Sequence, residues 1–229
     1  MPLADLRERR RRRRSARIVR DAQHLCDEPL LHAALLTQRG DAASTGLPQR
    51  TILVIGPTRV WALVGHRAHP GRAEEVLEEW PRARVTLTVG RGKERVLGLP
   101  DGGRVQAATL SLEAEAALAT PPAESAYLAD DDGIERVQPD GRGTRVTWES
   151  LRQVTLVRPT SAGWETVLFT GIHGDLRVPF GAMREALWER VRRLPGADAA
   201  LVETAIASAG PRDRLVWWQG MDTDPDQSL

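Results

Sequence analysis

The sequence has one cysteine, one lysine and no asparagine, and two of its absences limit where the protein works. Because Cys26 has no second cysteine to pair with, an internal disulfide framework is excluded and a reducing compartment is expected. No window approaches the roughly 20 apolar residues that a bilayer-spanning helix needs, and nothing resembles the apolar region of a signal peptide. We therefore expect a soluble, cytoplasmic protein without a transmembrane segment.

Motifs for catalysis, metals and cofactors are also missing. No G-x-S-x-G occurs, "GRGK" at 90–93 lacks the remaining positions of a phosphate-binding loop, and "DDD" at 130–132 lacks those of a calcium loop. His66 and His69 could be two metal ligands, but no cysteine or carboxylate stands at usable spacing, so a surface loop is the expected alternative. We expect no enzyme, no bound metal and no cofactor.

Arginine is abundant, and it is concentrated at the start of the chain. The first 20 residues hold nine arginines against Asp5 and Glu8, a net charge of +7, whereas the whole chain carries only +1. The densest run consists of Arg7, Arg9, Arg10, Arg11, Arg12, Arg13 and Arg14. Because like charges at helical spacing repel each other, we predict that residues 1–27 form a basic, partly disordered arm.

This run has two interpretations. Its guanidinium groups could bind the phosphates of anionic lipid or of nucleic acid. It could equally be a solvated tail that reflects a preference for arginine codons, since no aromatic residue is interleaved for base stacking.

The remaining 202 residues after the arm are long enough for two cores of ordinary size. Turn residues and the double proline 121–122 place a first β domain at 28–120 and a second domain, with C-terminal helices, at 123–218. Residues 219–229 contain almost nothing apolar and are predicted to be a disordered acidic tail. In the first domain, "RTILVIGPTRVWALVGHR" holds two apolar runs split by a Gly-Pro step, which predicts a strand pair.

The second domain has regular turn signals that predict six antiparallel strands. Their expected ranges are 125–129, 133–138, 144–148, 151–158, 164–171 and 175–180. Met183, Leu187, Val191 and Leu194 then recur at helical spacing and predict an amphipathic helix. A second helix is expected at 199–210, followed by a strand or packed segment at "RLVWWQ".

These elements indicate a mainly β protein of the α+β class. We expect a bent antiparallel sheet or partly open barrel whose open end is capped by the amphipathic helix, because a lone flat sheet would leave an apolar face and its edges exposed. Within "RVTWESLRQVTLV", Trp148 is predicted to point inward at a corner between two half-sheets.

The stretches "DGIERVQPDGRGTRVTWESLRQVTLV" and "WETVLFTGIHGDLRVPFGAMREALWERV" resemble the bacterial pleckstrin-homology-like (PH-like) domain, over about 123–194. Residues 28–120 resemble a divergent second copy, with a single larger β domain as the alternative. The resemblance implies a non-catalytic binding or scaffolding role with a protein partner. Related eukaryotic domains often bind phosphoinositides at the first strand turn, but "QPDGRG" places Asp140 beside Arg142 and makes a poor phosphate site.

The seven tryptophans provide the remaining candidate site. Trp61, Trp80, Trp148 and Trp164 stand at strand-like positions and are predicted to lie in the core. Trp217 and Trp218 cannot both point inward in a regular strand, so one of them is expected to be exposed or to pack on the second helix. Trp188, Trp217 and Trp218 are therefore candidate partner-binding residues, with packing between the domains as the alternative.

Two functions thus remain open from the sequence. The first is scaffolding through PH-like domains in protein-protein interaction. The alternative is binding of an anionic membrane surface or a nucleic acid, anchored by the arginine run.

Overall fold

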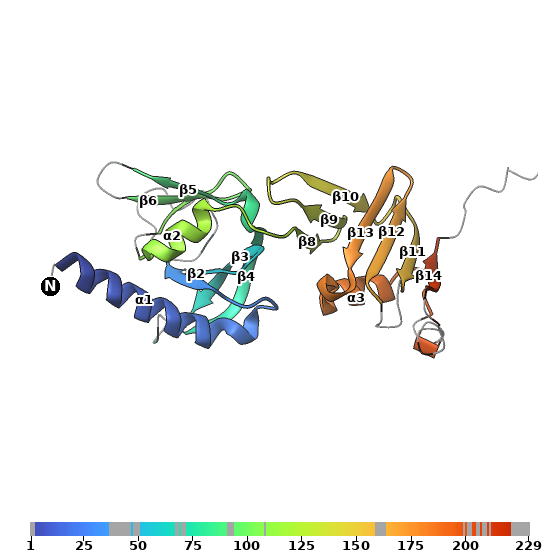
Figure 1. Ribbon diagram of the computed structural model, residues 1–229, viewed down its shortest axis with the longest axis horizontal. Coiled ribbons are helices and arrows are strands. Elements are labelled where there is room, and N and C mark those ends of the chain that lie inside the picture. Colours follow the sequence, from blue (N-terminus) through green and yellow to red (C-terminus); the bar gives the residue numbers. More distant parts are fainter. Residues whose placement is uncertain are drawn as a thin grey trace, which may run out of the picture. The chain divides into compact units, whose positions relative to one another are not determined.

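The computed structural model describes residues 3–36, 47, 51–66, 69, 72–90, 94–107, 109–158, 164–198, 200, 203–204, 207, 210 and 212–220. In this part of the chain, 14 strands form four open antiparallel sheets, accompanied by few helices (Figure 1). The predicted mainly β, α+β class is confirmed at this level. The chain divides into two units, Met1–Ala126 with Val137–Arg142, and Tyr127–Arg136 with Gly143–Leu229.

Unit 1 begins with a helix and contains two sheets. Helix α1 spans Leu3–Ala22 and is followed by the short 3-10 helix η1, Gln23–Leu25. The first sheet has the order β1-β2-β3-β4, with β1 at His32–Leu35, β2 at Thr51–Ile55, β3 at Arg59–Gly65 and β4 at Ala73–Pro81. After η3, Arg82–Arg84, the second sheet has β5 at Thr86–Val89, β6 at Arg95–Gly98 and β7 at Arg104–Gln106. Helix α2 spans Leu112–Ala119.

In the β1–β4 sheet, strands β2 and β3 are buried on both faces because they are apolar at successive positions, whereas the middle of β4 is mostly exposed. All five residues of β2 are buried, and the predicted strand pair around Gly56-Pro57 is confirmed as the β2-β3 hairpin. One face packs against Ile18 and Ala22 of α1. The other face packs against the β5–β7 sheet and α2, which contribute Leu97, Val105 and Ala114. This two-sided burial gives the N-terminal segment a surface on which to fold.

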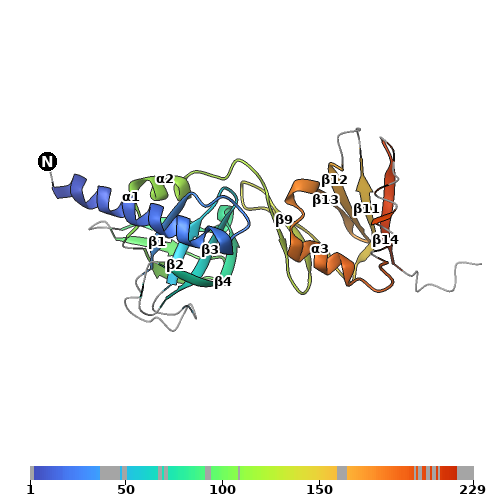
Figure 2. The same ribbon diagram turned by 90° about the horizontal axis from the view of Figure 1, so that it is seen from below.

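Helix α1 differs from the partly disordered arm expected at residues 1–27. It lies across the β1–β4 sheet (Figure 2), and Ser15, Ile18 and Ala22 on its inward side are buried. The Ser15 hydroxyl accepts a hydrogen bond of 2.8 Å from the backbone N–H of Ala33 in the edge strand β1. Tertiary packing thus stabilises a helix whose own charge pattern disfavours it.

Unit 2 contains most of a three-stranded sheet and all of a four-stranded one. The first has the order β10-β9-β8, with β8 at Ala126–Ala129, β9 at Gly133–Val137 and β10 at Gly143–Thr147. The second has the order β13-β12-β11-β14, with β11 at Leu151–Val157, β12 at Thr166–Gly171, β13 at Gly174–Pro179 and β14 at Arg214–Gln219. The short helices are η4, Phe180–Ala182, and α3, Glu185–Arg192. All six strands predicted for this domain are confirmed to within two residues.

The corner predicted at Trp148 joins β10 of one sheet directly to β11 of the other. Trp148 is half-buried against the unit 2 core, and its indole N–H donates to the Asp130 carbonyl oxygen at 3.0 Å. The amphipathic helix is confirmed over α3, where Leu187 and Val191 are buried in the same core, whereas Met183 and Leu194 pack on this core from outside the helix. Most of the helix predicted at 199–210, and the predicted tail from residue 221 onward, lie outside the described residues.

Candidate functional site

Helix α1 sorts its arginines onto one side. Its inward side holds Glu8, Arg11, Ser15, Ile18 and Ala22, which follow each other at steps of three and four, with Arg12 and Val19 beside them. The outward side holds Arg7, Arg9, Arg10, Arg13, Arg14, Arg17 and Arg20, and all seven are exposed. These seven residues are called the arginine face below. By helical spacing they form two rows, one of Arg7, Arg10, Arg14 and Arg17 and one of Arg9, Arg13 and Arg20.

The N-terminal half of α1 is fixed to unit 1 by polar contacts. A carboxylate oxygen of Glu8 accepts a hydrogen bond of 3.0 Å from the backbone N–H of Leu112, at the start of α2. Arg12 forms ion pairs with Glu8 at 3.5 Å and with Glu113 of α2 at 3.1 Å. Because both helix ends are held, the arginine face has a fixed direction.

The structure therefore divides the arginines predicted as an anionic-surface site. Arg7, Arg9, Arg10, Arg13 and Arg14 lie on the arginine face, whereas Arg11 and Arg12 lie on the inward side beside Glu8. Sequence reasoning missed Arg17 and Arg20, which lie outside the contiguous run. The signal that finds them is the helical spacing of Ser15, Ile18 and Ala22, since it identifies the inward side.

The arginine face concentrates positive charge with little internal compensation. Within it, only Arg17 has an ion pair among the described residues, with Asp21 at 4.0 Å. Arg9 and Arg13, like Arg10 and Arg14, stand four residues apart, and each such like-charge pair destabilises a helix by about 0.2–0.5 kcal/mol. An anion that lies along this face would remove that repulsion.

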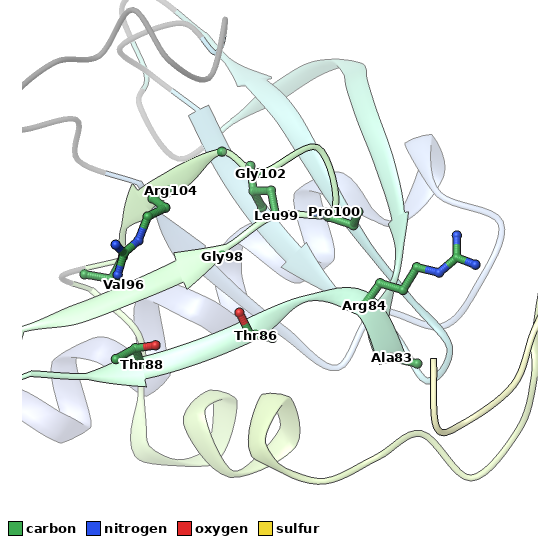
Figure 3. Close-up of a pocket in the computed structure, with 11 residues that line it drawn as sticks. Ala83, Arg84, Thr86, Thr88, Val96, Gly98, Leu99, Pro100, Gly102 and Arg104 are labelled. Carbon is green, nitrogen blue, oxygen red and sulfur yellow. The ribbon is translucent and has the colours of Figure 1, made fainter. Parts of the chain in front are cut away.

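A shallow cavity of about 620 Å³ lies on the outer face of the β5–β7 sheet (Figure 3). Thr86, Thr88 and Gly98 line its floor, and a Cβ atom at Gly98 would lie 2.5 Å from the Thr86 hydroxyl oxygen. The Arg104 side chain extends along β6 toward Val96, whereas the Arg84 guanidinium turns away and its Nε donates to the Gly141 carbonyl oxygen at 3.2 Å. With one of its two guanidinium groups directed elsewhere, this cavity is a weaker anion site than the arginine face.

The three candidate partner-binding tryptophans form one cluster in unit 2. Trp217 and Trp218 are each only 8% exposed, and Trp188 is half-buried with its ring stacked on Trp217 at 4.8 Å between centroids. Neither Trp217 nor Trp218 is exposed, so this part of the prediction was wrong, whereas most of the second helix, on which one of them was alternatively expected to pack, lies outside the described residues. In the β11-β14 pairing Val154 is opposite Trp218 and Thr155 is opposite Val216, so Trp217 is the extra residue of a β-bulge, and both indoles face the core.

Of the four tryptophans predicted to lie in the core, two are buried and two are half-buried. Trp61 and Trp80 are buried in unit 1, whereas Trp148 and Trp164 are half-buried at the edge of the unit 2 core. His66 and His69 stack on each other at 5.2 Å, and His66 Nε2 lies 3.7 Å from a Glu74 carboxylate oxygen. Among the described residues, no three potential metal-ligating side chains come together.

The acidic loop 130–132 and the turn 138–143 are held by internal ion pairs. Asp130 pairs with Arg145, Asp131 pairs with Arg190 of α3, and Arg142 Nη2 lies 2.6 Å from an Asp140 carboxylate oxygen. These contacts tie the loop to β10 and α3 within unit 2. The guanidinium groups of Arg142 and Arg145 are thus already engaged by carboxylates.

Asp130 should make the stability of unit 2 depend on pH. Burial raises the pKa of Asp130, but hydrogen bonds from Arg145 and from the N–H groups of Asp132 and Gly133 outweigh it and leave the pKa below its ordinary value. The unfolded chain therefore takes up the proton first, so this stabilisation is present above about pH 4 and is lost as pH falls through the folded pKa.

We expect the stability of unit 2 to fall less between pH 5 and pH 3 in Asp130→Asn than in the wild type. Urea unfolding across that range measures the difference. Arg145→Met should reduce the fall in stability in the same way, because it removes the strongest hydrogen bond to the carboxylate. A variant that keeps the full wild-type dependence on acid would contradict this assignment.

In the described part of the chain, no helix is long and apolar enough to cross a membrane. No family model, curated protein or solved structure matches this chain.

Proposed function

We propose that this protein is a non-catalytic binding protein that holds a phosphate-bearing polyanion on the arginine face of α1. The observation that carries the proposal is the exposure of seven arginines in two rows on a helix whose opposite side is packed into unit 1. Arginine suits this role because its planar guanidinium can donate two parallel hydrogen bonds to a phosphate.

The packing of α1 also favours binding, because it lowers the conformational entropy that is lost when the ligand binds. A disordered arm must lose conformational freedom when it binds, whereas a helix fixed by Ser15, Ile18 and Glu8 has lost most of it on folding. Binding also releases the counterions that accompany the polyanion, and this makes the affinity strongly dependent on salt.

Retention on phosphocellulose tests the proposal with a defined phosphate polymer. We expect wild-type protein to be retained and Arg9→Gln/Arg13→Gln/Arg17→Gln to elute at a clearly lower salt concentration. The variant should remain folded, since the substitutions remove like-charge repulsion. The measurement is the sodium chloride concentration at elution, with thermal unfolding as the check on folding.

The matched control is Arg152→Gln/Arg177→Gln/Arg214→Gln, which removes the same charge from exposed positions of unit 2. It should elute with the wild type. Equal shifts for the two triple variants would mean that net charge alone governs retention, and the proposal would be abandoned.

A second candidate function is scaffolding through PH-like units, with a protein partner. In its favour, unit 1 has a four-stranded sheet and a three-stranded sheet followed by α2 packed on the core, in line with the order of strands and then a helix on which the resemblance is based. On the outer face of the unit 2 sheet, Val157, Leu168 and Val216 line a shallow cavity of about 290 Å³, and Val216 is 44% exposed.

Affinity capture from the native cell separates the two candidates. Scaffolding predicts a partner whose capture is lost with Val216→Asp and kept with the triple arginine variant of α1. If Val216→Asp changes no captured protein, this face does not bind a partner.

A further inference from the structure

We infer that the polyanion is double-stranded DNA in the B form, with α1 lying in its major groove; this rests on the proposed function of the arginine face. The inference names the ligand class that the shape and composition of that face fit best. Three observations support it: the direction of the apolar side chains of α1, the dimensions of the helix with its two rows, and the residue types between the arginines.

The buried apolar side chains of α1 point away from any ligand. Ile18, Val19 and Ala22 pack into the core of unit 1. Among the α1 side chains that the structure describes, Leu6, at 41% exposed, is the only large apolar group on the surface. A helix that lies in a lipid interface buries its apolar side among the acyl chains, and here that side is occupied by the protein. Apart from Leu6, which stands four residues before Arg10, the outward side of α1 therefore offers charge without an inserting surface.

The dimensions of α1 match a DNA major groove. The helix has 20 residues, which corresponds to about 30 Å of length, and a helix with side chains is about 10–12 Å across. The major groove of B-form DNA is about 12 Å wide. One row, with Arg10 and Arg14, and the other row, with Arg9 and Arg13, diverge to either side of the outward direction. Each row can therefore reach the phosphates of one strand.

The residue types on the outward side of α1 favour contacts to phosphates and disfavour contacts to adenine. The arginine face lacks asparagine and glutamine, the amides that read adenine, and it lacks aromatic residues that would stack on unpaired bases. Direct base readout is therefore expected only at guanine, which arginine contacts in the major groove, and a preference for duplex over single strands follows. Double-stranded RNA is disfavoured because its major groove is deep and narrow.

Carboxylates near α1 restrict where the duplex lies. Asp21 stands beside Arg17 near the C-terminal end of the helix. Strand β4, which contacts η1 just beyond that end, exposes Glu74, Glu75 and Glu78. These charges repel phosphates, so the DNA is expected on the first two-thirds of the helix, around Arg7 to Arg14.

Fluorescence anisotropy with the full chain and a labelled 20-base-pair duplex, from 50 to 300 mM sodium chloride, tests the inference. If the five residues of the arginine face from Arg7 to Arg14 contact phosphates, the logarithm of affinity should fall with the logarithm of salt with a slope of about −4.5. Arg7→Gln/Arg10→Gln/Arg14→Gln/Arg17→Gln should reduce the slope to about −2, and Arg9→Gln/Arg13→Gln/Arg20→Gln to about −3. The triple variant of unit 2 should keep the wild-type slope.

The outcomes distinguish this inference from the proposed function. The inference is supported if single-stranded DNA and duplex RNA of equal length bind more weakly than the DNA duplex, and if both row variants lose affinity for that duplex. Equal affinity for these three nucleic acids, or a row variant that binds like wild type, overturns the groove placement. Binding to phosphatidylserine vesicles without binding to DNA overturns it while leaving the proposed function intact. If the wild-type protein is not retained on phosphocellulose, both the inference and the proposed function are overturned.

Discussion

Arg59→Met is expected to lower the free energy of unfolding of unit 1 by about 3–5 kcal/mol, because it breaks a buried ionic cluster from one side. The Arg59 side chain is only 5% exposed, and it pairs with Glu28 at 3.8 Å and with Glu79 of β4. Glu28 also accepts a hydrogen bond from the backbone N–H of Thr58 at 3.1 Å, and Glu79 accepts one from the Trp61 indole at 3.0 Å. Methionine fills much of the same space but leaves two carboxylates without their cation.

Hydrogen-deuterium exchange in urea, followed at the β2 and β3 amides, measures this loss in unit 1 alone, since the amides of the unit 2 strands are followed individually. Arg104→Met is the control, because Arg104 is exposed on β7 and its loss should change stability by no more than about 0.5 kcal/mol. The triple variant Glu28→Gln/Arg59→Met/Glu79→Gln should recover part of the stability, since removing a whole buried cluster costs less than breaking it. Unchanged exchange in Arg59→Met would mean that the two carboxylates do not need the guanidinium.

This cluster illustrates which features of the fold the sequence could reveal. The Gly56-Pro57 turn and its flanking apolar runs predict the β2-β3 hairpin from local signals alone. No local signal relates Glu28, Arg59 and Glu79, because they come from three separate segments that only the folded sheet brings together. Contacts between residues distant in the chain depend on strand order, which turn residues do not specify.

In helix α1, by contrast, a local signal is present in the sequence but tertiary packing outweighs it. Repulsion between neighbouring arginines is a real local effect, and it led to the prediction of a partly disordered arm. The helix forms because burial of Ile18 and Ala22, with the hydrogen bond from Ala33 to Ser15, outweighs that repulsion. The same packing turned a run of arginines into an oriented face, so the candidate site became visible only once the inward side of the helix was known.

In unit 2 the predicted strands matched closely because each is bounded by a local turn, such as Asp132-Gly133 before β9 or His173-Gly174 before β13. The exception was the orientation of Trp217 and Trp218. Strict alternation assumes that every residue of β14 pairs in turn with β11, and a single unpaired residue reverses the prediction for its neighbour.

Trp217→Ala and Trp218→Ala are each expected to lower the free energy of unfolding of unit 2 by about 3–5 kcal/mol, the usual cost of truncating a buried tryptophan. Trp218 also donates its indole N–H to the Pro195 carbonyl oxygen at 2.8 Å, and Trp217 stacks on Trp188. Urea unfolding followed by near-ultraviolet circular dichroism and by exchange of the β11 and β12 amides measures both losses.

Val216→Ala is the matched control in the same strand, because Val216 faces solvent on the opposite side of the sheet from Trp218 and should cost less than about 1 kcal/mol. A regular strand predicts a different result, in which Trp217→Ala resembles Val216→Ala and only Trp218→Ala is costly. Equal, large losses in both tryptophan variants require both side chains to face the core. Such losses would also assign this pair to the interior of unit 2, so that partner binding has to be sought on surfaces such as the arginine face.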